Sequence, residues 1–293
     1  MKKSILAAAA AAALAAPTLA TAQQAPAAQS PHTFTGNISL VSDYRFRGIS
    51  QTAGKPALQG GFDYAHSSGI YLGNWNSNVS EGAGFPQANL EMDFYGGWKK
   101  AFGDFGLDIG AIYYYYPGSD WDPARQVGGA LANPRDPTKT HTGKIDNKEV
   151  YIGGSWKWLS AKWFYSLDDY FSLPGTKGTQ YFDLAATYDL GGGWGIVGHV
   201  GRLKSKGWQT GTDATRLNYT DWKIGVTKDV GGWVFGAAYV DTNAKGSCNA
   251  ANPGFYCFGN DLPNGGPGAA TSAGVNFKDA GKGTVVLSVS KTF

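Results

Sequence analysis

Charged side chains recur at alternate positions of strand-length segments, where they could line a polar passage. In residues 89–99, for example, Glu91, Asp93 and Lys99 alternate with apolar residues. Charged groups at bilayer depth are tolerated when they face a watery or paired interior. Side chains of both signs could set up a transverse field that orients a small polar solute. The predicted pore-lining residues are Asp43, Arg45, Arg47, Asp63, Glu91, Asp93, Lys99, Glu149 and Lys223.

The same residues have a purely structural explanation. Arg45 and Arg47 could pair with Glu91, Asp93 or Asp63 in a network that fills a narrow lumen, since interior ion pairs often serve packing and register. For any single residue we prefer this explanation. For the lumen as a whole we expect a passage, because about twelve strands enclose more space than the eight whose interiors side chains fill.

Histidines and glycines supply no catalytic or phosphate-binding pattern. Among the four histidines, His32, His66, His141 and His199, only His199 is predicted at membrane depth, and no nucleophile is grouped with it in the sequence. Strings of glycine mark turns, because no helix follows them that could bind a phosphate. The sequence therefore predicts neither an enzyme nor a cofactor.

The two cysteines, Cys248 and Cys257, lie close together in a segment rich in Gly, Asn and Pro. In an exported protein such a pair is expected to form a disulfide that fixes a loop. A metal site would need more ligands nearby, and the segment has no histidine. We therefore expect a disulfide and no metal.

The elements that would position the charged residues are amphipathic strands. Residues 89–116 contain two segments of period two joined by Ala101-Phe102-Gly103, each about as long as the roughly 9–11 residues that cross a bilayer at a tilt. The pattern recurs from a first strand at about Thr33–Arg47 to a last strand ending at Phe293. Tight glycine-rich turns alternate with long polar loops, including Gly118–Asp146, which could fold inward, and Thr242–Lys282.

This order predicts an all-β fold: a single transmembrane antiparallel up-and-down barrel of about 12 strands, with short periplasmic turns and long extracellular loops. Closure would remove exposed strand edges. The 10 tryptophans, 16 tyrosines and 15 phenylalanines, many beside predicted turns, are typical of the aromatic girdles of such barrels. A stacking track for sugars is the alternative explanation of these rings.

The start of the chain is typical of an export signal. Lys2 and Lys3 precede an apolar Ala-rich run and the small residues Ala20-Thr21-Ala22. We expect a signal peptide at 1–22, a flexible leader at 23–32 and the barrel at 33–293. No later stretch supplies the ~18 apolar residues of a spanning helix.

Net charge argues against nucleic acid as a partner. The precursor has 25 basic and 22 acidic residues; without Lys2 and Lys3 the count is 23 against 22. No basic stripe is present.

The last strand ends in Phe293. A terminal aromatic residue is similar to the end of bacterial outer-membrane barrels, whose last strand is read by the barrel-assembly machinery. Localisation in the cell outer membrane, contact with outer-membrane lipid and handling by that machinery are therefore expected. Barrels of this kind often form homo-oligomers, but no interface patch stands out from the lipid-facing surface.

Three segments in the first third of the chain resemble the TorF family, predicted porins of Gram-negative bacteria. They are Ser39–Thr52 (SLVSDYRFRGISQT), Pro56–Tyr64 (PALQGGFDY) and Gly69–Trp75 (GIYLGNW). Residues 91–97 and 113–118 fit the same pattern. The resemblance implies an outer-membrane barrel whose transported substrate is not established, and so it bears on the fold more than on mechanism.

Three functions follow as hypotheses. The first is a channel that allows passive diffusion of small polar solutes. The second is a non-conducting barrel with a structural or adhesive role, whose lumen would be plugged. The third is a membrane-embedded hydrolase that depends on His199.

Overall fold

The structure, a computed structural model, describes residues 30–293 except 81–82, 86–87, 121–131, 134–135, 141–142, 208–216, 245–247, 249–254 and 260–276. The predicted signal peptide at 1–22 lies outside the described residues, as does the leader up to residue 29. Among the residues described, no helix has the length and apolar character to cross a membrane.

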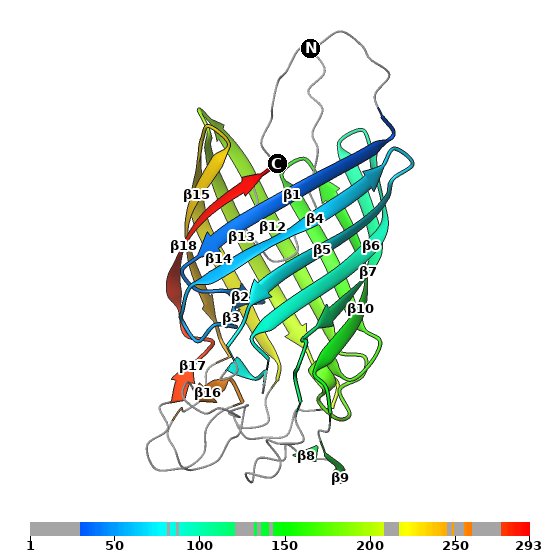
Figure 1. Cartoon of the computed structure of the whole chain (residues 1–293), viewed down its shortest axis with the longest axis vertical. Coiled ribbons are helices and arrows are strands. Elements are labelled where there is room, and N and C mark those ends of the chain that lie inside the picture. The colour runs from blue at the N-terminus through cyan, green and yellow to red at the C-terminus, as the bar shows by residue number, and fades with distance from the viewer. Residues whose placement is uncertain are drawn as a thin grey trace.

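Twelve antiparallel strands close into one barrel, which confirms the predicted fold class (Figure 1). The strands are β1 (His32–Val41), β4 (Ala57–His66), β5 (Ile70–Asn78), β6 (Leu90–Phe102), β7 (Phe105–Tyr115), β10 (Asp146–Trp156), β11 (Leu159–Ser166), β12 (Gln180–Gly191), β13 (Trp194–Lys204), β14 (Tyr219–Val230), β15 (Trp233–Thr242) and β18 (Thr284–Thr292).

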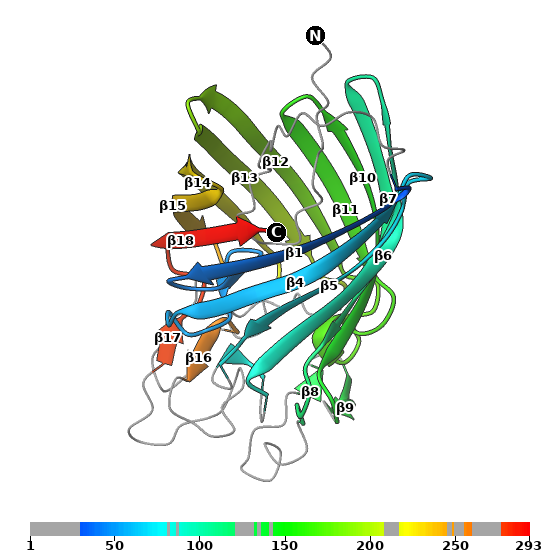
Figure 2. The same ribbon diagram turned by 45° about the horizontal axis from the view of Figure 1, so that its top comes forward.

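The chain forms a meander in which each barrel strand pairs with the next. β1 closes the ring against β18, with Leu40 opposite Val289, as Figure 2 shows. Short turns such as 103–104 and 192–193 lie at one end, which we call the turn end, together with the last strand residue Thr292. All the long connections lie at the other end, the loop end. The predicted alternation of short and long connections is therefore present.

Small elements decorate the loop end. They are β2 (Arg45–Phe46) paired with β3 (Ile49–Ser50), β8 (Ala132–Asn133) paired with β9 (Asp136–Thr140), β16 (Cys257–Gly259) paired with β17 (Phe277–Asp279), and the 3-10 turn η2 (Tyr170–Ser172). Figure 1 places β8, β9, β16 and β17 beyond the end of the barrel wall.

Two predicted strand boundaries are wrong. The first strand ends at Val41 instead of Arg47, because the chain turns inward at residues 42–44. The connection predicted at Ala101-Phe102-Gly103 is a turn at 103–104, and β6 extends to Phe102.

The outer face of the barrel is apolar, although it is not packed against protein. Phe34 is 75% exposed and Phe62 is 74% exposed, and these two are only the extremes of a continuous set. Single exposed apolar residues are ordinary, but a closed belt of them is typical of the lipid-facing surface of transmembrane barrels. The alternation predicted for residues 90–99 and 105–115 is present, with Leu90, Phe94 and Ile109 on the outer face.

Lysines stack on aromatic rings around the turn end. The ammonium of Lys228 lies 5.0 Å from the ring centre of Trp194, and that of Lys291 lies 4.9 Å from the ring of Trp233. Lys157 makes the same contact with Trp156 at 4.8 Å. Aromatic rings and snorkelling lysines are typical of a membrane interface. These contacts favour the girdle explanation of the aromatic residues.

Candidate functional site

The predicted pore-lining residues all lie inside the ring of strands, but they form separate groups. Asp43, Arg45 and Arg47 belong to an inward-folded connection. The others project inward from strands: Asp63 from β4, Glu91, Asp93 and Lys99 from β6, Glu149 from β10 and Lys223 from β14.

Residues 42–56, which we call the inward hairpin, connect β1 to β4 and occupy the loop end of the lumen. β2 and β3 are its two short strands, and Figure 1 shows them within the outline of the barrel. The ring of Tyr44 packs edge-on against Trp75 of β5, and the ring of Phe46 against Tyr114 of β7. The aromatic residues that continue the alternation of β1 therefore contact the inner wall at β5 and β7.

The tip of the inward hairpin is a two-residue turn, Arg47-Gly48, with φ of 48° and 79°. Positive φ at both central positions is what a tight hairpin turn with the twist of its strands requires. A Cβ on Gly48 would lie 2.5 Å from Cγ2 of Thr242 and 2.6 Å from Cβ of Asp221. Glycine is required here both for the backbone and for the close approach to β14 and β15.

Arg47 fastens this tip to β10 through a bidentate ion pair. Its Nη1 donates to Oε1 of Glu149 at 3.0 Å and its Nη2 donates to Oε2 at 2.6 Å. The two side chains are 5% and 1% exposed. Tyr114 and Ser166 donate further hydrogen bonds to the same carboxylate, each at 3.3 Å. A buried carboxylate is tolerable when it accepts this many donors.

Four aromatic rings surround the Arg47 guanidinium. Its central carbon lies 4.3 Å from the ring centre of Tyr181, 4.8 Å from Phe46, 5.1 Å from Phe164 and 5.8 Å from Tyr170. Nη1 also donates to the Tyr170 hydroxyl at 3.2 Å. Burial raises the pKa of Tyr170 to about 12, so this phenol keeps its proton at neutral pH.

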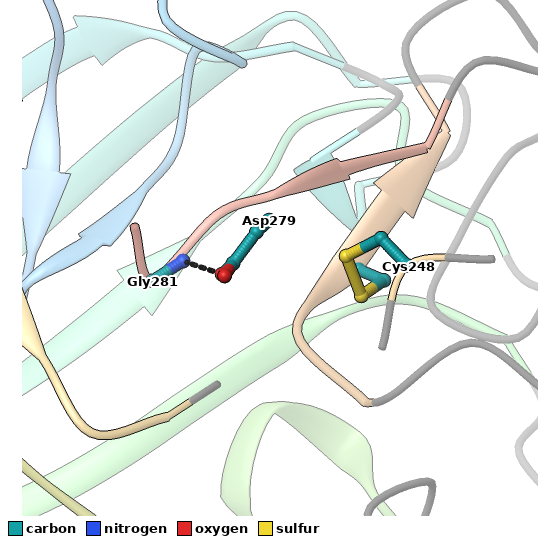
Figure 3. The surroundings of a disulfide bond; sticks show 4 residues. Cys248, Asp279 and Gly281 are labelled. Atoms are coloured by element: carbon teal, nitrogen blue, oxygen red, sulfur yellow. Dashed lines mark hydrogen bonds between the residues drawn. A yellow bond between two sulfur atoms is a disulfide. The ribbon is translucent and has the colours of Figure 1, made fainter. Parts of the chain in front are cut away.

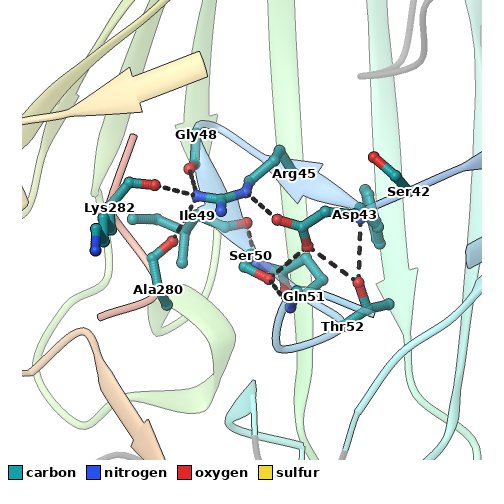
Figure 4. Close-up of polar contacts among 12 residues, drawn as sticks. Ser42, Asp43, Arg45, Gly48, Ile49, Ser50, Gln51, Thr52, Ala280 and Lys282 are labelled. Carbon is teal, nitrogen blue, oxygen red and sulfur yellow. Dashed lines mark hydrogen bonds and ion pairs between the residues drawn. The ribbon is translucent and has the colours of Figure 1, made fainter. Parts of the chain in front are cut away.

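Arg45 and Asp43 hold the inward hairpin to the segment between β17 and β18, as Figure 4 shows. Nε of Arg45 donates to Asp43 at 2.5 Å, while Nη1 donates to the backbone oxygens of Ala280 at 2.9 Å and Lys282 at 3.1 Å. Asp43 accepts hydrogen bonds from Ser50 and Thr52 as well. The expected pairing of Arg45 and Arg47 with Glu91, Asp93 or Asp63 is wrong, because the hairpin turns them toward Asp43 and Glu149.

The loop end of the lumen is filled by packed side chains. Glu91 is fully buried and accepts a hydrogen bond from the Tyr44 hydroxyl at 3.1 Å, and Asp93 on the same strand is 3% exposed. Aromatic residues of the inward hairpin and other connections, including Phe85, Phe171 and Tyr256, line a remaining cavity of about 90 Å³. Among the described residues, these packed side chains occupy the loop end of the lumen.

The lumen nearer the turn end is polar and partly exposed. Lys162 of β11 pairs with Asp108 of β7 at 2.7 Å, with side chains 19% and 15% exposed. Tyr71 also donates to Asp108, at 2.6 Å, and the ammonium of Lys99 lies 5.3 Å from the Tyr71 ring centre. These contacts form a charged face on β5, β6, β7 and β11. Asp63 lies near this level and accepts a hydrogen bond from Tyr95 at 2.6 Å.

His199 on β13 lies between two carboxylates of the neighbouring strands, on the inner face of the barrel wall. Its Nδ1 lies 3.2 Å from Asp183 of β12 and its Nε2 lies 2.7 Å from Asp221 of β14. Lys223 is the cross-strand neighbour of His199. Both ring nitrogens are thus engaged with carboxylates, an arrangement suited to wall structure and unlike that of a free general base.

The structure joins Cys248 to Cys257 in a disulfide at the loop end, with Cα atoms 5.3 Å apart (Figure 3). Cys257 begins β16, which pairs with β17. At the end of β17, the side chain of Asp279 accepts a hydrogen bond from the Gly281 amide at 2.9 Å. Within the described part of the chain, no group of three or more His, Cys, Asp or Glu side chains is placed to hold a metal ion.

Sequence reasoning missed the partners of Arg47. Tyr114 and Ser166 project inward on the strands beside Glu149, and strand parity applied to every polar residue would have identified them. Tyr170 lies in a connection, where no periodicity marks it. The predicted inward role of Gly118–Asp146 concerns a segment partly outside the described residues, and its described strand β9 lies beyond the barrel wall.

Several solved structures are similar to this chain at low sequence identity. They include a FadL homologue of Pseudomonas aeruginosa (12% identity, 89% of each chain covered, TM-score 0.39) and the Pseudomonas putida toluene transporter TodX (9% identity, 90% of each chain, TM-score 0.42). Acinetobacter baumannii OccAB4 is 11% identical over 89% of this chain and 62% of its own, with a TM-score of 0.36. Likenesses at this level carry no inference about activity.

A comparison with curated proteins found no match. The profile of a bacterial protein family of unknown function, Gcw_chp, matches residues 25–262. These residues cover most of the chain, from before β1 to beyond β16. The chain therefore belongs to the Gcw_chp family.

Proposed function

We propose that this protein is an outer-membrane channel for passive diffusion of small polar solutes, and that the inward hairpin holds it closed in the conformation described. The observation that carries the proposal is the difference in polarity between the outer and inner faces of the barrel wall. The outer faces of the strands are apolar, while Lys162, Asp108, His199 and Asp183 face inward at membrane depth. Charged residues in such positions are costly unless water or partners accompany them.

The passage would run from the partly exposed lumen at the turn end toward the loop end, past the inward hairpin. Residues 42–56 form a separate lobe held by the Arg47–Glu149 pair and by Arg45, so the hairpin could move while the twelve-strand ring stays closed. A solute would then meet the face formed by Lys162, Asp108 and Lys99.

Placement in the outer membrane accompanies this function. The turn end would face the periplasm and the loop end the outside, as expected for barrels with long outer loops. The signal peptide at 1–22, recognition of Phe293 by the barrel-assembly machinery and membership of the TorF family remain predictions. Outer-membrane lipid would contact the apolar belt, and a homo-oligomer would have to form through part of the same belt.

Planar-bilayer recording tests the channel. Purified folded protein should give discrete current steps, and removal of the inward hairpin by joining β1 to β4 with a short Gly-Ser turn should lengthen or enlarge them. A folded sample that passes no current in either form would contradict the proposal.

A second function, a non-conducting structural or adhesive barrel, is favoured by one observation. The loop end is occupied by packed side chains, including a buried ion pair whose carboxylate accepts two further hydrogen bonds. On this reading the hairpin is a permanent plug, and its removal would lower the stability of the barrel without opening a conducting path.

A further inference from the structure

The outer face of the barrel carries a groove over strands β10–β14. Its volume is about 660 Å³. The groove lies between two neighbouring rows of outward side chains, one through Ile152, Trp163 and Phe182 and the other through Ala161 and Leu184. Ala161 and its neighbour Gly154 are small where the surrounding residues are large, and the surface is hollowed there.

Two cations lie at the loop-end margin of this groove. Arg202 continues the row of Trp163 and Phe182, and Lys204 follows it on the same face of β13. Both are exposed. Arg202 donates one hydrogen bond, from Nη1 to the hydroxyl of Thr220 at 2.9 Å, which directs the guanidinium along the barrel surface.

The outward residues of β13 on the turn-end side of Arg202 are uncharged: Val200, Gly198, Ile196 and Trp194. The outward side chains that line the groove itself, including Ile152, Trp163, Leu184 and Val200, are apolar apart from Arg202 and Thr220 at its loop-end margin. In the membrane this end lies at the level of the outer headgroups, where Lys and Arg are stabilised by phosphates. An Arg fork and a hydroxyl beside it are suited to phosphate oxygens.

We propose that this groove binds a phosphorylated lipid of the outer leaflet, with acyl chains over Ala161 and Leu184 and the phosphate on Arg202 and Lys204. A second copy of the chain fits less well, because a two-fold contact through this face would bring the same cations together. The inference uses the proposed outer-membrane placement but not conduction through the lumen.

Lipid retention tests the site. The full-length protein in detergent would be titrated with lipid A, a phosphorylated and acylated disaccharide, and examined by native mass spectrometry. R202Q and K204Q should each weaken retention about fivefold, the worth of one cation near an anionic headgroup. A161F should weaken retention by filling the groove. Dephosphorylated lipid A should bind weakly, and millimolar inorganic phosphate should not compete.

Matched controls use outward residues elsewhere on the barrel. K228Q removes an outward cation at the turn end, and A237F enlarges an outward alanine of β15; both should retain lipid as the unaltered protein does. Heat-dependent gel mobility would show that each variant is folded. If all folded variants bind lipid A equally, or if A161F abolishes a lipid-free dimer instead, the lipid site is wrong. Lipid retention without current would contradict only the channel, and current without phosphate-dependent retention would contradict only this site.

Discussion

Replacing Arg47 by alanine should release the inward hairpin. The Glu149 side chain, 1% exposed beside Arg47, would lose its bidentate cation and keep only the two longer hydrogen bonds from Tyr114 and Ser166. Removing one partner of a buried pair costs about 3–5 kcal/mol. Because the unpaired charge is relieved when the hairpin leaves and water enters, about 3 kcal/mol would shift the closed-to-open equilibrium by roughly 150-fold.

The matched control is K148Q. Lys148 is the neighbour of Glu149 on β10 and pairs with Asp168 at 2.8 Å, but these side chains are 49% and 51% exposed. Exposed pairs contribute about 0–1 kcal/mol, so this variant should behave as the unaltered protein. The double variant R47M/E149Q removes both charges, so no unpaired charge stays buried. It should shift the closed-to-open equilibrium less than R47A alone does.

Two assays read the outcome. Single-channel recording should show a larger open fraction for R47A, and hydrogen exchange should show lost protection in residues 42–56. Two amides report directly on docking: Ser50, which donates to the Ala280 oxygen, and Ser80, which donates to the Gln51 oxygen. If R47A keeps the protection of these amides while remaining folded, Arg47 is not what holds the hairpin, and the reasoning above is wrong.

Three further results are expected. Ile224→Arg, on the outer face in the middle of β14, should lower the free energy of unfolding in bilayers by about 2–4 kcal/mol, whereas an equal cost in detergent-free buffer would deny a lipid contact. Lys162→Glu would place a second negative charge beside Asp108 and should move the reversal potential toward cation selectivity in a salt gradient; an unchanged potential would mean that ions do not pass this pair. Replacing Cys248 and Cys257 by serine should lower the local stability of the loop between β15 and β18 by about 2–3 kcal/mol. Proteolysis within this loop should become faster, while the melting temperature of the barrel should change little.

The barrel could be predicted from the sequence because its strands alternate strictly. On β6, Glu91 and Asp93 face inward and Phe94 faces outward as expected, since a one-residue slip would expose every charge to lipid. The position of the long connections follows from the topology. In an antiparallel meander successive connections lie at alternate ends of the barrel, so long connections that alternate with short turns all lie at one end.

The inward hairpin could not be predicted because its residues continue the period of β1. Asp43, Arg45 and Arg47 alternate with Tyr44 and Phe46 as a strand would. Tertiary contacts end the strand. The rings of Tyr44 and Phe46 pack on the inner wall, and the Arg47 guanidinium binds the Glu149 carboxylate on another strand. Contacts between positions a hundred residues apart leave no trace in local periodicity.

A spin-label scan along β14, one position at a time from Tyr219 to Val230 in reconstituted bilayers, tests most directly whether lipid lies outside this ring and water within. Labels at Trp222, Ile224 and Val226 should be relaxed by oxygen, which concentrates in lipid, and labels at Lys223 and Thr227 by a water-soluble nickel complex. Relaxation by the nickel complex at both sets of positions would show water on both faces and contradict a membrane-spanning barrel.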